Sequence, residues 1–412
     1  MVPLFNQTRT GIANLKFHEI WDYLYLHSMV IFVAYVNGFK EDGILNENAF
    51  CVTFAPVRST RGRARPLEAG HGLSGEVSGS MLLSHLLSIW TGINLAAWLL
   101  LAAVIDLMTG DPLWYYHPVR LIGRLSMLLE SLIRRHPWQR LGLRVTGALM
   151  SIFVVLLALS FVSAVLWVAR DISIWLYFFM VVLWTYWGLA IRGLTDAALL
   201  VYRPLVTNQA DEARQWLQYI VSRDTTHLSH DDMIRATIET VAGNTCDAVI
   251  GPLFYAFLGG PAWLWAYKAV NTVDSMVGQH SGRYEDFGWF AAHLDEWANW
   301  IPARLSGLAI SVAASMEGRF RQAYSTMKAD GRRHPAPNTG ISEAAMAGAI
   351  GVSLGGPNVY DRVVALTPTM GITERPLHPT AIIHAIAVSW RAILVTAVTF
   401  GVIAVIMSGH WL

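Results

Sequence analysis

An amide, a carboxylate and a glycine recur at helical spacing in the segment 271–278. On an α-helix, Asn271, Asp274 and Gly278 stand at i, i+3 and i+7 and share one side. An amide and a carboxylate beside a glycine gap suit a hard cation with bound phosphate oxygens, because magnesium takes few protein carboxylates and keeps its waters. Asp295 and Asn299 repeat the pair at i, i+4, which predicts either a second magnesium contact or a helix cap.

A second set of charged residues leads into an apolar stretch. Asp231, Arg235 and Glu239 recur at four-residue intervals and share one face if this segment is helical. Taken alone, the pattern is equally typical of a solvated charged stripe. Asp247, however, directly precedes the apolar stretch 249–257. Polar side chains that enter a membrane-embedded segment need partners, and a ligand or a metal ion is one source of them.

Several basic residues are candidates for binding an anion. Arg332, Arg333 and His334 precede a turn bracketed by prolines, and guanidinium groups match phosphate oxygens with paired hydrogen bonds. The alternative is a loop with incidental charge. His117 and Arg120 are a further candidate pair for an anion. The sequence therefore offers phosphate-binding groups in two separate places.

The elements that must position these side chains are membrane spans. Of the 412 residues, 54% are hydrophobic and 14% are charged, which is far more apolar than an ordinary soluble domain. A helix needs roughly 20 apolar residues to cross the hydrocarbon core. Stretches that meet this requirement are residues 82–105, 145–169 and 172–191. Residues 392–408 are a fourth candidate, which can extend backward past Arg391 because a long cationic side chain near a helix end can reach the interface. The sequence therefore predicts an all-α, polytopic helical membrane protein with helical cytoplasmic segments.

A further apolar stretch, residues 249–270, is interrupted by Leu258-Gly259-Gly260-Pro261. The interruption predicts two half-helices or a re-entrant hairpin as readily as one span. We favour the re-entrant hairpin, because it keeps all polar clusters on one side of the membrane. Asp106 lies at the mouth of the first apolar stretch, where a charge is costly. It is a functional candidate, and an interfacial helix cap is the alternative.

Other features limit the class of protein. Residues 1–80 are predicted to form a poorly ordered N-terminal extension, followed by one membrane-embedded domain, residues 81–412. The net charge of +1 argues against a nucleic-acid partner. Cys51 and Cys246 are the two cysteines and cannot define a disulfide framework or a zinc site. No Walker or dinucleotide-binding glycine motif is present.

In combination, five segments resemble the family of adenosylcobinamide-phosphate synthases of cobalamin biosynthesis, in order along residues 95–370. They are Gly110-Asp111-Pro112 with His117-Pro118-Val119-Arg120, Val221-Ser222-Arg223-Asp224-Thr225, Ala269 to Gly278, Trp300-Ile301-Pro302-Ala303-Arg304-Leu305, and Leu354-Gly355-Gly356-Pro357-Asn358. The resemblance implies an enzyme of the bacterial inner membrane, with several spans in the lipid bilayer. It further implies a ligase that uses ATP and Mg²⁺ to join aminopropanol, or its phosphate, to the propionate carboxylate of adenosylcobyric acid.

This reaction assigns expected roles to the candidate residues. Activation of a carboxylate by a nucleotide needs magnesium and guanidinium groups where phosphate charge develops, and attack by an amine needs a base. The expected catalytic residues are Glu239, Asp247, Asp274 and Asn271. The expected metal ligands are Asp247, Asp274 and Asp295, with Glu239 as an alternative ligand or base. The expected substrate and phosphate contacts are His117, Arg120, Arg223, Asp224, Arg283, Arg333 and Asn358.

One position departs from the pattern of the family. Gly243 stands where the family has an acidic residue, so this chain either is impaired or uses Glu239 instead. A non-catalytic membrane regulator on the same scaffold is therefore one alternative. A small-solute transporter is another, but the long spans are too uniformly apolar for a polar path. Other enzymes of cobalamin assembly are expected partners. The synthase hypothesis requires Glu239, Asp247 and Asp274 to converge.

Overall fold

The computed structural model describes residues 97–110, 116–135, 141–221, 223–278, 282–360 and 363–407. The predicted N-terminal extension and most of the predicted span 82–105 lie outside these residues. Within these residues, four helical stretches are long and apolar enough to cross a membrane: Leu143–Ile172, Ile174–Val206, His230–Val277 and Thr380–Met407. The predicted all-α membrane fold is confirmed.

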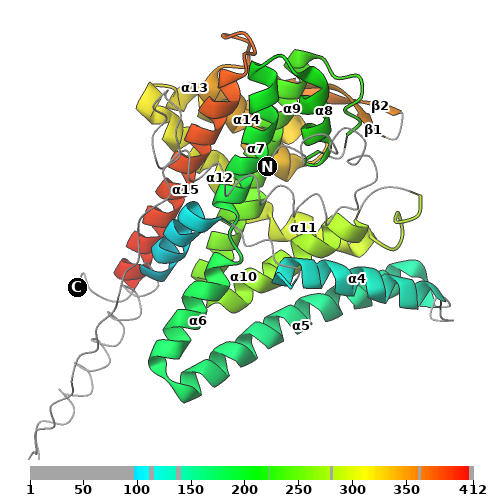
Figure 1. The fold of residues 1–412 in the computed structure, drawn as a ribbon, viewed down its shortest axis with the longest axis vertical. Coiled ribbons are helices and arrows are strands. Elements are labelled where there is room, and N and C mark those ends of the chain that lie inside the picture. Colours follow the sequence, from blue (N-terminus) through cyan, green and yellow to red (C-terminus); the bar gives the residue numbers. More distant parts are fainter. Residues whose placement is uncertain are drawn as a thin grey trace, which may run out of the picture. The chain divides into compact units, whose positions relative to one another are not determined.

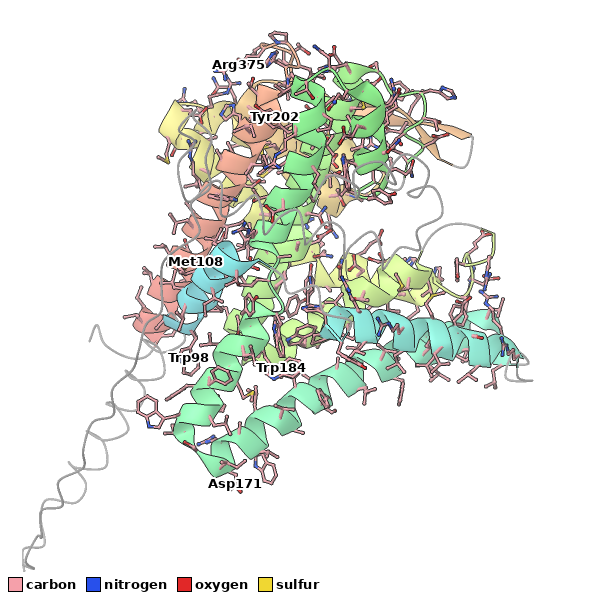
Figure 2. All side chains as sticks on the ribbon, viewed as in Figure 1. Trp98, Met108, Asp171, Trp184, Tyr202 and Arg375 are labelled. Atoms are coloured by element: carbon pink, nitrogen blue, oxygen red, sulfur yellow. The ribbon has the colours of Figure 1, made fainter. Side chains whose placement is uncertain are left out.

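Helices α5 (Leu143–Ile172) and α6 (Ile174–Tyr186) form the most apolar pair (Figure 1). The two helices are joined at Ser173, and Asp171, in the last turn of α5, lies near the corner between them (Figure 2). Ser173 begins α6 by accepting a hydrogen bond from the backbone N–H of Trp175 at 3.2 Å. Large apolar side chains point away from the protein, with Trp167 and Trp175 exposed by 70% and 77%. This outer surface is suited to lipid.

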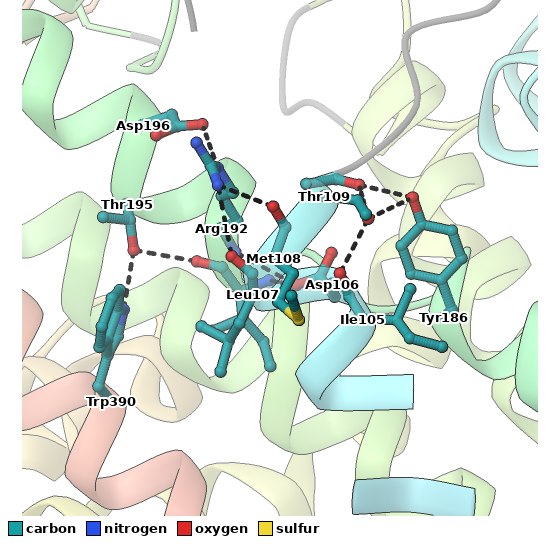
Figure 3. A network of polar contacts seen from close by, with 12 residues as sticks. Ile105, Asp106, Leu107, Met108, Thr109, Tyr186, Arg192, Thr195, Asp196 and Trp390 are labelled. Atoms are coloured by element: carbon teal, nitrogen blue, oxygen red, sulfur yellow. Dashed lines mark hydrogen bonds and ion pairs between the residues drawn. The ribbon is translucent and has the colours of Figure 1, made fainter. Parts of the chain in front are cut away.

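The short apolar helix Ala97–Thr109 ends beside α7 (Ile191–Val206). The Asp106 carboxylate accepts hydrogen bonds from the backbone N–H groups of Ile191, at 2.6 Å, and Arg192, at 3.2 Å (Figure 3). These N–H groups begin α7 and have no partner within the helix. Asp106 therefore caps a helix, as the alternative interpretation predicted. Trp390 of α15 (Thr380–Met407) donates to Thr195 of α7 at 2.8 Å and joins these two helices.

The chain reverses direction within α10 (Gly251–Val277) at Gly259 and Gly260. Gly260 has φ +69° and ψ −163°, a combination that is essentially restricted to glycine. The rings of Tyr255 and Tyr267 stack with centroids 4.9 Å apart, whereas a straight helix would separate these positions by about 18 Å. The segment is therefore a helical hairpin, and its interpretation as one straight span is wrong.

Replacing Gly260 with alanine is expected to lower the free energy of unfolding by about 1–3 kcal/mol, because a Cβ atom strains this backbone conformation. Urea titration in detergent micelles, followed by tryptophan fluorescence, measures the change. Gly282→Ala is the matched control, since its new Cβ meets no atom within 4 Å and its φ is not positive. Equal stability of both variants would contradict the glycine-dependent reversal.

The polar part of the fold is a set of shorter helices. Helices α9 (His230–Asn244), α12 (Trp300–Ala313), α14 (Pro337–Ile350) and α15 pack against one another. Helix α14 is rich in buried alanine and glycine, and Gly348 leaves room for the backbone of α13 (Phe320–Asp330). Small side chains let these helices approach closely. The remaining described helices are α4 (Pro118–Arg135), α8 (Ala210–Gln218) and α11 (Trp289–Ala298).

One element of the described chain departs from the all-α prediction. Strands β1 (Leu354–Tyr360) and β2 (Val363–Met370) form an antiparallel hairpin with an irregular register between Leu354 and Gly356. Gly355 and Gly356 have φ values of +85° and +104°, which glycine adopts without a steric penalty. The segment Leu354-Gly355-Gly356-Pro357-Asn358, which contributes to the family resemblance, therefore lies in a strand.

Candidate active site

A cleft of about 530 Å³, part of which is open to solvent, lies where α9, α14 and the π-helical turn η3 (Thr245–Ile250) meet. Its lining is mostly polar and comes from segments far apart in the sequence. The lining residues are Ile220, Val221, Arg223, Glu239, Thr240, Gly243, Asn244, Asp247, Thr339 and Glu343. Three of the predicted site residues, Arg223, Glu239 and Asp247, are thus brought together.

A buried ion pair forms one wall of the cleft. Arg223 donates from Nη2 to Glu239 Oε2 at 2.5 Å and from Nη1 to Asn358 Oδ1 at 2.6 Å. The other oxygen of Glu239, Oε1, accepts the backbone N–H of Gly355 at 2.8 Å. Arg223 and Glu239 are only 8% and 4% exposed. Both oxygens of Glu239 therefore hold structural partners, which favours a positioning role over the predicted role as a base or metal ligand.

The β-hairpin is fixed to α9 by Arg235. Its guanidinium donates to the backbone oxygen of Gly355, and it donates from Nη2 to Pro357 O at 3.2 Å and to Asp232 Oδ1 at 2.9 Å. A Cβ atom at Gly356 would overlap with this guanidinium. Helix α9 itself begins with a capping box, in which Ser229 and Asp232 exchange hydrogen bonds. These contacts hold Asn358 where it meets Arg223.

Asp247 reaches the cleft from η3, and π-helical turns are frequent at functional sites. The turn is anchored on one side by Thr245, whose hydroxyl lies 2.8 Å from Ser389 Oγ on α15. On the other side, the Tyr267 hydroxyl lies 3.3 Å from Asp247 O and donates to Asn299 Oδ1 at 2.8 Å. The helical hairpin of α10 therefore supports the backbone that presents Asp247.

A second acidic group lies next to this support. Asp295 on α11 accepts hydrogen bonds from Asn299 Nδ2 at 3.0 Å and from Asn271 Nδ2 at 3.3 Å. Burial raises the pKa of Asp295, the two amide hydrogen bonds lower it, and the charge of Glu296 raises it. The predicted pair of Asp295 with Asn299 is therefore present, whereas Asn271, which the sequence grouped with Asp274, donates to Asp295 instead. The roles assigned to these residues remain predictions.

The carboxylate of Asp274 lies over Gly278. Any Cβ atom at Gly278 would overlap with Asp274 Oδ1, so the carboxylate folds over the glycine gap that the helical spacing predicted. Of the three residues that the synthase hypothesis requires to converge, Glu239 and Asp247 line the cleft and Asp274 does not. Asp274 lies within electrostatic range of both Asp247 and Asp295. Within the described ranges, no group of three or more His, Cys, Asp or Glu side chains is placed to hold one metal ion.

The other predicted phosphate contacts lie elsewhere in the fold. Arg333 is exposed and pairs with Asp330 at 3.2 Å, and Arg283 is exposed and pairs with Glu130 at 3.1 Å. Neither is among the residues that line the cleft. Asp224 accepts the backbone N–H of Thr226 at 2.9 Å and so shapes the turn that follows Arg223.

His117 and Arg120 lie at the start of α4, also outside the lining of the cleft. His117 is buried, and its ring centroid is 6.3 Å from that of Trp265 on the helical hairpin. Arg120 is half-buried. These two predicted anion contacts therefore do not line the cleft with Arg223, and their role stays a prediction.

Glu343 lines the cleft and was not selected from the sequence. It is 7% exposed on α14, and His334 Nε2 lies 3.7 Å from its Oε2. Burial raises the pKa of Glu343 well above its usual range, the Glu239 charge raises it further, and the Arg223 charge lowers it. Burial lowers the pKa of His334. The sequence does contain a signal for Glu343, because it is a glutamate within an alanine-rich helix. Such a helix packs closely against its neighbours, and burying a charge there is costly unless the charge has a function.

The shifted pKa of Glu343 predicts a pH-dependent stability. The folded chain keeps a proton on Glu343 at pH values where the unfolded chain has lost it, so the free energy of unfolding falls as pH rises through this window. The expected fall is about 1.4 kcal/mol per pH unit, beginning at the ordinary glutamate pKa. Glu343→Gln should remove this fall and be more stable than wild type at neutral pH. Denaturant titrations from pH 4 to pH 8 compare the two slopes, and equal slopes would contradict the prediction.

The described chain is thus a helical membrane protein with a charged cleft that gathers an arginine and acidic side chains beside its apolar helices. Residues 99–389 match the family described as CobD/Cbib protein, and the chain belongs to this family. The predicted family resemblance is therefore confirmed.

Curated relatives cover the same part of the chain. The cobalamin biosynthesis protein CobD of Geobacter metallireducens is 44% identical over 287 residues, which are 68% of this chain and 88% of the relative. CobD of Photorhabdus laumondii is 40% identical over 317 residues, which are 77% of this chain and 99% of the relative. The cobalamin biosynthesis protein CbiB of Salmonella arizonae is 40% identical over 300 residues, 73% of this chain and 94% of the relative. No solved structure matches the chain.

Proposed function

We propose that this protein acts in cobalamin biosynthesis as an ATP-dependent ligase. It joins the amine of aminopropanol, or of aminopropanol phosphate, to the propionate carboxylate of adenosylcobyric acid. The observation that carries the proposal is the convergence of Arg223, Glu239, Asp247 and Glu343 on one cleft. The names of the relatives, which are cobalamin biosynthesis proteins, support the pathway.

The cleft offers the groups that carboxylate activation needs. Transfer of a phosphoryl group from ATP to the propionate gives an acyl phosphate, and negative charge develops on the phosphate oxygens. Arg223 can stabilise this charge, because its two contacts with Glu239 and Asn358 use two of the five N–H donors of the guanidinium. The amine then attacks the acyl carbon, the new C–N bond forms, and phosphate leaves.

The acidic residues fit a magnesium ion of the kind that accompanies ATP. Magnesium is usually held by one or two carboxylates together with substrate phosphates and water, so three clustered protein ligands are not required. Asp247 lines the cleft, and Asp295 lies within electrostatic range of it. Asp247 is the proposed ligand, with Asp295 and Asp274 as further acidic groups nearby. A bound magnesium would neutralise phosphate charge during the transfer.

The proposed cellular setting follows from the apolar helices and from the family. We place the protein in the bacterial inner membrane with several spans and with the cleft on the cytoplasmic side, where ATP is available. The expected substrates are adenosylcobyric acid and aminopropanol or its phosphate. Other enzymes of cobalamin assembly are proposed partners in the same membrane.

The direct test measures ADP released by the full chain in lipid nanodiscs. With Mg²⁺, ATP and adenosylcobyric acid present, ADP should form at a rate that depends on the amine, and mass spectrometry should detect adenosylcobinamide or its phosphate. Parallel reactions with aminopropanol and with its phosphate identify the preferred amine. The absence of ADP and of amide product with both amines would reject the ligase proposal.

A regulator on the same scaffold is the second candidate, and Gly243 favours it. Gly243 lines the cleft, and a Cβ atom there would lie 3.3 Å from Thr339 Cγ2. The cleft therefore lacks an acidic side chain at a position where the family resemblance implies one. A regulator would bind adenosylcobyric acid without consuming ATP. Complementation of a strain unable to make cobinamide from cobyric acid separates the two functions, since only the ligase restores growth.

A further inference from the structure

The acidic residues around the cleft differ in how their oxygens are occupied. Both oxygens of Glu239 accept strong hydrogen bonds, from Arg223 at 2.5 Å and from the backbone of Gly355 at 2.8 Å. Both oxygens of Asp295 accept amide hydrogen bonds from Asn271 and Asn299. These two carboxylates are held by the protein and are poorly placed to bind a substrate.

Glu343 is different. It is 7% exposed and lines the cleft. Among the described residues, its carboxylate pairs with His334, whose Nε2 lies 3.7 Å from Oε2, beyond ordinary hydrogen-bond distance. A buried carboxylate that faces a cleft without a strong partner is costly unless a ligand supplies one. A cationic group is the ligand that best offsets this cost.

We infer that Glu343 binds the primary ammonium group of the amine substrate and accepts its proton before the amine attacks the activated carboxylate. The inference rests on the proposed function. An ammonium ion has no free electron pair, so it must lose a proton before it can form the C–N bond. Glu343 takes this proton, the nitrogen attacks the acyl carbon, and the C–O bond to phosphate breaks. The phosphate leaves with the electrons of that bond, and the second nitrogen proton passes to the phosphate or to water.

The surroundings of Glu343 suit this role. Burial and the charge of Glu239 raise the pKa of Glu343, which makes its carboxylate a stronger base than an exposed one. The other charged or titratable groups that face it are His334, before α14, and Arg223, Glu239 and Asp247 across the cleft. Binding of a cation next to Glu343 favours its ionised form, so the proton acceptor is generated by the substrate itself.

An experiment with hydroxylamine as the amine tests the role of Glu343 independently of the proposed ligase function. Hydroxylamine is uncharged at neutral pH, so it attacks an acyl phosphate without giving up a proton first, and the product is a hydroxamate. The experiment uses the full chain in nanodiscs with Mg²⁺, ATP and adenosylcobyric acid, and supplies either aminopropanol or hydroxylamine. The variants are Glu343→Gln, Glu343→Asp and, as a matched control, Glu374→Gln, which changes an exposed carboxylate paired with Arg319 at 2.8 Å.

We expect Glu343→Gln to form amide at least about 100-fold more slowly than wild type, with a raised KM for the amine, and to form hydroxamate at the wild-type rate. Glu343→Asp should recover part of the amide formation, with a shifted pH profile, and Glu374→Gln should behave as wild type. Equal loss of amide and hydroxamate in a Glu343→Gln variant that is at least as stable as wild type would overturn the role of Glu343. Failure of the wild type to form either product would instead reject the ligase function.

Discussion

Replacing Glu239 with alanine should destabilise the protein by about 3–5 kcal/mol, because it leaves the guanidinium of Arg223 buried without its counter-charge. The pair is 2.5 Å apart, both side chains are almost fully buried, and Gly355 loses the acceptor of its backbone N–H as well. The change should also abolish ligase activity, since Arg223 and the β-hairpin both depend on Glu239 for their position. Urea titration in detergent measures the stability, and ADP release measures the activity.

A double variant distinguishes the contribution of the ion pair to stability from its contribution to catalysis. Arg223→Met with Glu239→Leu removes both charges, and such replacements of a buried ion pair are often neutral or stabilising. We therefore expect the double variant to regain much of the stability lost in Glu239→Ala while remaining inactive. Asp286→Ala is the control, because it breaks an exposed pair with Arg144 at 2.8 Å and should change neither property. An active double variant would show that the ion pair has no part in the reaction.

The helical hairpin could be predicted from the sequence because its cause is local. Two glycines followed by a proline, in the middle of an apolar stretch, leave few conformations other than a break. The shared face of Asp231, Arg235 and Glu239 followed in the same way from the helical period. The helical period does not predict which of these residues is buried, because burial depends on partners that lie far away in the sequence.

The partners of the buried pair show why the rest of the site was not predictable. Asn358 meets Arg223 across 135 positions and Gly355 meets Glu239 across 116, so no local pattern links them. Glu343 was overlooked for a related reason: its neighbours in the helix are small and apolar, and its charged neighbours come from other segments. Arg333 was selected for its charge, yet the adjacent His334 is the residue that lies near Glu343. Charge alone does not show which way a side chain points.

The geometry of the cleft shows what the absence of a side chain at Gly243 changes. The position lines the cleft on α9, one helical turn from Glu239 and one turn from Asp247. An acidic side chain there would enter a cleft that already holds Glu239, Asp247 and Glu343, and would add to their mutual repulsion. A glycine at this position therefore reduces the charge of the cleft. Under the proposed function, the metal and amine contacts would come from the remaining carboxylates.

Asp247→Asn is the sharpest test of the proposed metal contact. The amide keeps the size of the side chain but removes the charge, so we expect ADP release to fall about 10²–10³-fold and to require more Mg²⁺ for half-maximal rate. Asp274→Asn and Asp295→Asn should have smaller effects, because these residues do not line the cleft.

The control for this series is Asp171→Asn, a change at the turn between α5 and α6 that should leave the rate unchanged. Magnesium titrations of all four variants then rank the acidic groups by their distance from the reaction. The hairpin of α10 supports the backbone of Asp247 through Tyr267. Gly260→Ala should therefore also raise the Mg²⁺ concentration needed for half-maximal rate, though less than Asp247→Asn does. If Asp247→Asn kept the wild-type rate while Asp274→Asn lost it, the metal would lie on the hairpin rather than in the cleft, and the proposed geometry of the reaction would be wrong.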